Sequence, residues 1–165
     1  MISDNDRDII EQQLGRSIRG ALEVAHRCAC GKPDVVKTAP RLEDGTPFPT
    51  VYYLTCPKAT GAVGTLEANG VMREFQNELD SDEELALKYK QAHEQYLEVR
   101  EALGHVEEIA GISAGGMPNR VKCLHVLVAH SLAAGPGVNP LGDKALAILE
   151  PWNVSGTCVG EEVCE

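Results

Sequence analysis

The first segment of the chain repeats apolar residues at steps of three and four positions. This spacing is followed by Ile9, Ile10, Leu14, Ile18, Leu22 and Ala25. Residues spaced in this way share one face of an α-helix, because a helix turns once in about 3.6 residues. The pattern predicts an amphipathic helix over roughly residues 4–26. The segment "CACGKP" then ends it, with Gly31 and Pro33 as helix breakers.

Two runs of β-branched and aromatic residues come next. They are "DVVKTAP" and "FPTVYYLT", and between them lies "RLEDGTP". The pair Asp44-Gly45 in that segment is a turn signal, since both residue types favour the backbone angles of tight turns. The pattern predicts a β-hairpin with a longish loop.

The middle of the chain returns to helical patterns. In "CPKATGAVGTLEANG", Pro57 suits the first turn of a helix and Gly70 suits its end. "VMREFQNELD" predicts a short helix. "SDEELALKYKQAHEQYLEVREALG" predicts a long one, with Ser81 and Glu84 as a capping box and Gly104 as the stop.

The last third begins with "GISAGGMP", which is typical of a loop, after which Pro118 opens a predicted helix to about Ala134. "GPGVNP" ends that helix and "LGDKALAILE" predicts a final short one. We therefore expect an α+β fold, a mainly helical single domain with one small hairpin. The domain is expected over residues 1–150, followed by a tail, 151–165, that carries Cys158 and Cys164.

The predicted 118–134 helix concentrates polar and reactive side chains in an apolar run, "RVKCLHVLVAH". Cys123 and His130 are seven residues apart and would share a face, with Arg120 one turn earlier, whereas His125 would lie nearly opposite Cys123. Burying Arg120, Lys122 and His130 without partners is costly, which favours a site. Cys123 and His130 are the catalytic candidates. The alternative is a core helix in which the cysteine packs as a small hydrophobe and the histidine is hydrogen-bonded.

The glycine-rich segment before this helix suggests an anion site. "SAGGMP" would lead into the helix N-terminus, where free N–H groups and the helix dipole attract anions. Arg120 and Lys122 would lie in the first turn, so Gly115, Gly116, Arg120 and Lys122 are the substrate-binding candidates. The spacing of a P-loop is absent. An ordinary glycine-rich connector is the alternative.

Composition excludes some classes of protein. The formal net charge is −10 and aromatic residues make up 4% of the chain, which argues against a nucleic-acid binder. No apolar stretch approaches the ~18 residues of a membrane span. The acidic N-terminal segment has no secretory signal pattern, so a cytoplasmic location is expected.

Six cysteines remain to be explained. In a reducing compartment they are thiols, metal ligands or catalysts more often than disulfides. No C-x-x-C pair is present, so spacing alone does not decide between zinc, an iron–sulfur cluster, a redox disulfide and no cofactor. Cys164, next to the end, is expected to be frayed and inert. The candidate metal ligands are Cys28 (or Cys30), Cys56, Cys123 and Cys158. They lie at the ends of predicted elements or on the predicted 118–134 helix.

Several segments together resemble one known family. They are "CGKPDVV", "FPTVYYLTCP", "GGMPNRVKCLHVLVAHSLAAGPGVNPLGD" and the cysteine-containing tail. The chain resembles domain of unknown function 501, a bacterial and largely actinobacterial family, over nearly its whole length. The resemblance implies no activity. It implies family positions at Cys28, Cys56, Cys123, Cys158, Arg120, Lys122, His125 and His130, and genes for cell-division and polyphosphate-related proteins nearby.

Two functional hypotheses stay open, and whether the protein is an enzyme is undecided. In the first, Cys123 or a metal acts beside His130 on an anionic, for example phosphorylated, small substrate held by Arg120 and Lys122. In the second, the cysteines hold a structural metal, and the acidic surface docks a cytoplasmic partner related to cell division or polyphosphate. A closed site of four protein ligands would favour structure, and an open coordination position would favour catalysis.

Overall fold

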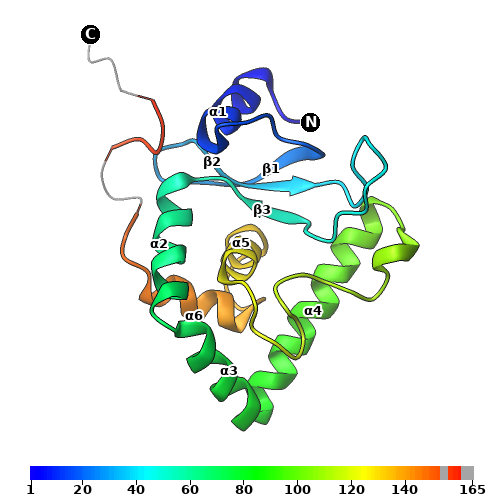
Figure 1. The fold of residues 1–165 in the computed structure, drawn as a ribbon, viewed down its shortest axis with the longest axis vertical. Helices are drawn as coiled ribbons and strands as arrows, with labels where there is room; N and C mark the ends of the chain where they lie inside the picture. Colours follow the sequence, from blue (N-terminus) through cyan, green and yellow to red (C-terminus); the bar gives the residue numbers. More distant parts are fainter. Residues whose placement is uncertain (153–155, 161–165) are drawn as a thin grey trace.

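The computed structural model describes residues 1–152 and 156–160, and its elements confirm the expected α+β, mainly helical fold. Figure 1 shows them as a three-stranded sheet with helices around it. In chain order they are α1 (Asp4–Leu14), β1 (Ala21–Arg27), β2 (Pro33–Thr38), β3 (Tyr52–Leu54), α2 (Pro57–Ala68), α3 (Val71–Ser81), α4 (Glu83–Leu103), the short 3₁₀ helix η1 (Glu107–Ile109), α5 (Leu124–Ala134) and α6 (Pro140–Ile148).

The predicted hairpin is present as β2 and β3, which pair antiparallel with Val36 opposite Tyr53. Almost every residue of β2 is buried. Successive side chains of a strand point in opposite directions, so both faces of β2 are covered. Val35 belongs to the main core with the helices, and Val36 packs in a smaller cluster with Ile10 and Ile18. The sheet therefore separates α1 from the other helices.

The predicted helix over residues 4–26 is wrong in its second half. α1 ends at Leu14, and Gly15 follows in the left-handed conformation with φ 67°, donating its N–H to the carbonyl of Glu11. Residues 21–27 instead form β1, which pairs antiparallel with β2 and completes the sheet. The apolar residues keep a helical spacing beyond Gly15, but this spacing does not take account of pairing with another strand. Pairing with β2 makes residues 21–27 a strand.

The helices surround α5. In Figure 1, α5 is seen end-on below the sheet, with α2 on one side, α4 on the other and α6 beside it, while α1 lies above the sheet. α5 packs against β3, α6 and α2. Its sequence is apolar almost all round, as expected of a helix buried on most sides.

Two of the predicted helix ends in the middle of the chain follow local signals, and one does not. Pro57 lies in the first turn of α2, and Gly104 follows the end of α4, as predicted. The predicted capping box at Ser81 is wrong, because Ser81 is the last residue of α3. Asp82 caps α4 instead, its carboxylate accepting the N–H of Leu85 at 3.0 Å.

Membrane-spanning helices are absent from the part of the chain that the structure describes, since none of its helices is both long and apolar enough to cross a bilayer.

Candidate functional site at the start of helix α5

α5 begins six residues later than the sequence predicts, and residues 118–123 are not helical. The preceding glycines fold this segment back on itself. The N–H groups of Arg120 and Lys122 donate to the carbonyls of Gly116 and Gly115, each at 2.8 Å. Gly116 has φ 92°, and a Cβ there would lie 2.7 Å from the Arg120 carbonyl oxygen, so only glycine fits this close approach.

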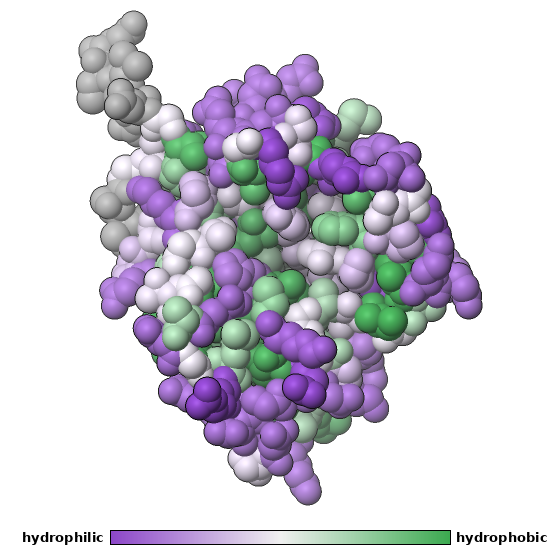
Figure 2. All heavy atoms as spheres, in the orientation of Figure 1, coloured by the Kyte–Doolittle hydropathy of each residue, from purple (hydrophilic) through white to green (hydrophobic). Residues whose placement is uncertain are grey.

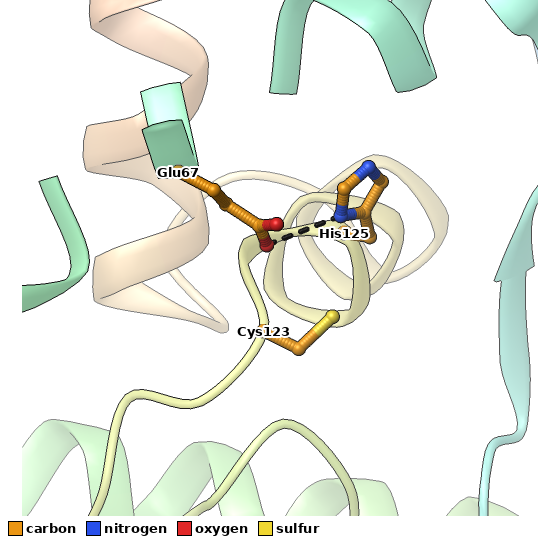
Figure 3. Close-up of side chains that lie close together, drawn as sticks. All are labelled: Glu67, Cys123 and His125. Carbon is orange, nitrogen blue, oxygen red and sulfur yellow. Dashed lines mark hydrogen bonds and ion pairs between the residues drawn. The ribbon is translucent and has the colours of Figure 1, made fainter. Parts of the chain in front are cut away.

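The late start of the helix changes which side chains meet. Cys123 is now the N-cap of α5, with extended backbone (φ −155°, ψ 110°), and its sulfur turns toward His125 in the first turn. The prediction that His125 lies opposite Cys123 is therefore wrong, because it assumed a helix through both residues. Glu67 completes the cluster from the end of α2, as Figure 3 shows. The thiol, the imidazole and the carboxylate offer ligand atoms within 4.8 Å of one another.

Glu67 holds both the helix and the histidine. Its Oε1 accepts the N–H of Leu124 at 2.8 Å and lies 3.1 Å from Nδ1 of His125. A carboxylate at this point also interacts favourably with the positive end of the α5 dipole. Sequence analysis missed Glu67, because no local pattern links it to a helix that begins 57 residues later.

Both ring nitrogens of His125 face acceptors. Nδ1 faces Glu67, and Nε2 lies 3.2 Å from the carbonyl oxygen of Thr60. An imidazole that donates from both nitrogens is an imidazolium. The hydrogen bond with Cys123 and the charge of Glu67 together raise the pKa of His125 to about 9, although burial acts in the opposite direction. We therefore assign His125 as a cation at neutral pH.

The thiol of Cys123 responds in the opposite sense. Burial alone would raise its pKa, but the hydrogen bond from His125 and the backbone N–H of Val126 outweigh burial and lower it. The N–H of Val126 belongs to the first turn of α5, where the helix dipole also favours a negative charge. The arrangement sets a thiol of lowered pKa beside an imidazole of raised pKa, and Glu67 orients the imidazole.

A pocket of about 210 Å³ opens beside this pair. Figure 2 shows the corresponding face, which is hollowed near its centre and lined there by hydrophobic and weakly polar residues, with hydrophilic residues toward the rim. The described residues that line the pocket include no aspartate, glutamate, lysine or arginine. They are Thr50, Tyr52, Tyr53, Leu54, Thr60, Cys123, His125 and Val126.

Comparison with known families identifies the chain. A family model described as "Protein of unknown function (DUF501)" matches residues 24–147. The chain belongs to the DUF501 family. The searches of curated proteins and of solved structures found no match. The matched range contains Glu67, Cys123 and His125 of this DUF501 protein, and it ends before Cys158.

His130 of this DUF501 chain lies elsewhere, in the core. Its Nδ1 accepts from the Asn139 amide at 3.1 Å, and its Nε2 donates to Gln95 at 2.6 Å. The ring stacks on Tyr52 and meets the edge of Tyr96. The expectation that His130 shares a wall with Cys123 is wrong, because Cys123 precedes the helix. A catalytic role for His130 stays a prediction.

The predicted anion site at Gly115, Gly116, Arg120 and Lys122 does not lie at a helix N-terminus. Arg120 and Lys122 are exposed and precede α5 rather than lying in its first turn. Their backbone N–H groups are bonded within the loop to Gly115 and Gly116, and the first turn of α5 already holds Glu67. Anion binding by these four residues stays a prediction.

The remaining cysteines form a second group. Cys30 lies 3.6 Å from Cys158, sulfur to sulfur, and also interacts with the thiol of Cys28. Cys56 interacts electrostatically with Cys158 and Cys28. Cys123 instead interacts with His125 and Glu67. The predicted set thus divides, with Cys123 in the first site and the others together. Cys164 lies outside the described residues.

Proposed function

We propose that this DUF501 protein is a thiol-dependent enzyme in which Cys123 is the nucleophile. The single observation that carries the proposal is the contact of Cys123 with a histidine that Glu67 and the Thr60 carbonyl hold as a cation. A thiolate is the nucleophilic form of cysteine, and a neighbouring imidazolium and a helix N-terminus both stabilise it. Cys123 is partly exposed and lines the pocket, so a substrate can reach its sulfur.

The pocket favours a small, uncharged acyl substrate. Its volume of about 210 Å³ is below the range of roughly 300–1,000 Å³ of sites for drug-sized ligands. Tyrosine and threonine hydroxyls provide polar contacts, while no lysine or arginine lines the pocket. An anionic, phosphorylated substrate therefore gains no support from this lining.

The reaction that these groups support is acyl transfer to water. The Cys123 sulfur attacks the carbonyl carbon, forming a thioester, and the bond to the leaving group breaks. The leaving group departs with the bonding electron pair and takes the Nε2 proton of the His125 imidazolium, which otherwise faces the Thr60 carbonyl. Neutral His125 then removes a proton from water, which attacks the thioester and releases the acid, restoring the thiolate–imidazolium pair. Glu67 is a positioning residue that orients the ring.

A zinc ion at the same three residues is the competing occupant, because cysteine, histidine and glutamate are all zinc ligands. The hydrogen bonds favour the metal-free site. Zinc would have to displace a proton from His125 and break its contact with Glu67, whose Oε1 also accepts the N–H of Leu124.

The proposal is tested by the pH dependence of Cys123 alkylation with iodoacetamide, followed by mass spectrometry of its peptide. We expect the midpoint for Cys123 to lie below about 8.5, the ordinary cysteine value. His125→Gln should move it upward, because the hydrogen bond from His125 lowers the pKa of the thiol. Glu67→Gln should change it less, because the carboxylate supports the imidazolium but its own charge raises the pKa of the thiol. His105→Gln, at an exposed histidine paired with Glu101, should leave it unchanged.

Activity is tested with a panel of small esters and thioesters. Cys123→Ala should abolish hydrolysis, and His125→Gln should lower kcat by about 10²–10⁴-fold, the range that acid–base catalysis contributes. The ion pair would be overturned if the pH midpoint of Cys123 alkylation had the ordinary cysteine value and did not change in His125→Gln. Protection of Cys123 from alkylation by one equivalent of Zn²⁺ would show a metal site instead.

A further inference from the structure

Four cysteines from three separate segments converge at the edge of the sheet. Cys28 and Cys30 lie in the turn between β1 and β2, Cys56 is the N-cap of α2, and Cys158 comes from the tail. In Figure 1 the red tail segment passes beside the start of α2 and the sheet edge. Cys28, Cys56 and Cys158 are buried, with exposed fractions of 6%, 0% and 8%. Convergence over such sequence distances requires the fold and does not follow from chain proximity.

The spacing of two sulfurs fits ligands of one metal ion. Cys30 Sγ and Cys158 Sγ are 3.6 Å apart, whereas a disulfide requires about 2.05 Å. Two thiolates at about 2.3 Å from a tetrahedral zinc ion lie about 3.8 Å from each other. In a four-iron cluster each thiolate binds its own iron, so the ligand sulfurs lie farther apart.

Backbone N–H groups surround the sulfurs. The N–H groups of Lys32 and Cys158 donate to the Cys30 sulfur, and that of Cys30 donates to Cys28. A tight turn holds this arrangement, with the N–H of Gly31 donating to the Cys28 carbonyl at 2.8 Å. Metal-bound thiolates accept such bonds, which orient the ligands and disperse their charge.

The other two sulfurs have donors of the same kind. The N–H groups of Ala59 and Lys58, in the first turn of α2, donate to Cys56. The side-chain amide of Gln13, in α1, donates to Cys158 at 3.3 Å while bonding the Pro33 carbonyl at 2.6 Å. Thiolates of Cys30 and Cys158 at 3.6 Å would repel each other strongly without a cation. Among the described residues, no three of the four sulfurs lie within 4.8 Å of one another, so a bound ion would draw Cys28 and Cys56 toward this pair.

We propose that Cys28, Cys30, Cys56 and Cys158 form a tetrathiolate site for a single zinc ion. Four protein ligands leave no open coordination position, so this site is structural and separate from Cys123. It fastens the tail to the β1–β2 turn and to the start of α2. Lys32 supports the same docking through its bond to the Val159 carbonyl.

The test is metal analysis of the full-length protein purified under reducing conditions. We expect one zinc per chain, and replacement by Co²⁺ should give the intense sulfur-to-cobalt charge-transfer absorption of a tetrahedral thiolate site. Cys30→Ser and Cys158→Ser should lose the zinc or bind it far more weakly. Cys123→Ser is the matched control and should retain one zinc, as should Cys164→Ser.

A measurement on the unmodified chain covers the case in which the variants fail to fold. Bound zinc should protect Cys28, Cys30, Cys56 and Cys158 from alkylation while Cys123 still reacts, and a chelator should remove the protection and lower the Tm. Loss of zinc in Cys123→Ser, retention in Cys158→Ser, a Cys30–Cys158 disulfide or an iron–sulfur spectrum would each overturn the site.

Discussion

Two histidines near α5 are held in opposite protonation states by their neighbours. His125 faces a carboxylate, a backbone carbonyl and a thiol, all of which favour the imidazolium. His130 is enclosed by Tyr52, Tyr96 and two side-chain amides, and burial lowers its pKa to about 4. The residue type does not distinguish them, because the shift comes entirely from what the fold places around each ring.

The low pKa of His130 predicts an acid-sensitive contribution to stability. Its pKa falls from 6.5 in the unfolded chain to about 4 in the fold, so between these values only the unfolded chain takes up the proton. The contribution is present above pH 6.5 and is lost as the pH falls to about 4, amounting to about 3 kcal/mol of unfolding free energy.

The measurement is urea unfolding of the wild type and of His130→Gln between pH 7 and pH 4. The variant should be less stable at pH 7 and should lose less stability on acidification. His105→Gln, at an exposed position, serves as the control. Between pH 6.5 and pH 4 its free energy of unfolding should change with pH as that of the wild type does. Parallel curves for the wild type and His130→Gln would contradict the assignment.

Packing of α5 against α6 depends on the absence of a side chain at Gly142. A Cβ at this position would overlap the Leu127 carbonyl oxygen and the Ser131 hydroxyl on α5. The N–H of Gly142 also bonds the capping amide of Asn139 at 3.0 Å. The two helices therefore approach closely at backbone level.

Gly142→Ala should lower the free energy of unfolding by about 1–3 kcal/mol, the usual cost of overpacking. Gly64→Ala in α2 is the matched control. A Cβ there would meet no atom within 4 Å, so it should raise stability by about 0.5–1 kcal/mol through helix propensity. Denaturant unfolding of both variants measures the difference. A neutral Gly142→Ala would show that α6 can move away without cost.

At the scale of the whole molecule, Arg100 joins three segments. The guanidinium is almost fully buried, with 1% exposed. It donates to the carbonyls of Pro49, Ile109 and Ile112 at 3.0, 2.6 and 2.6 Å. These carbonyls come from the loop before β3, from η1 and from the loop after it. Arg100 therefore fixes α4 to the segment that leads into β3. The residues of β3 line the Cys123 pocket.

Arg100→Lys should destabilise the protein by about 3 kcal/mol, since one ammonium cannot reach three carbonyls and leaves buried acceptors unpaired. Arg41→Lys, at an arginine that pairs with Glu108 on the surface, should change stability by less than about 1 kcal/mol. Thermal and denaturant unfolding compare the two. Equal effects would mean that the buried hydrogen bonds of Arg100 contribute little.

The sequence by itself determined the elements that have local causes. Asp44-Gly45 lies between the strands of the hairpin, Pro57 opens α2, and Gly104 follows α4. Each of these signals acts within a few residues, through backbone angles and hydrogen bonds of the adjacent turn. Cys123 was also recognisable as a candidate nucleophile, because a thiol among apolar and basic residues is conspicuous.

Tertiary structure alone decided the partners. Hydrogen bonds from Arg120 and Lys122 to Gly116 and Gly115 fold the loop before α5 and determine where the helix begins. Because α5 begins after Cys123, the thiol contacts His125 and not His130. Glu67 and Cys158 become part of their sites only when α2 and the tail are in place. Periodicity describes one element at a time. Charge, burial and pKa depend on atoms from other elements, and their positions result from packing of the whole chain.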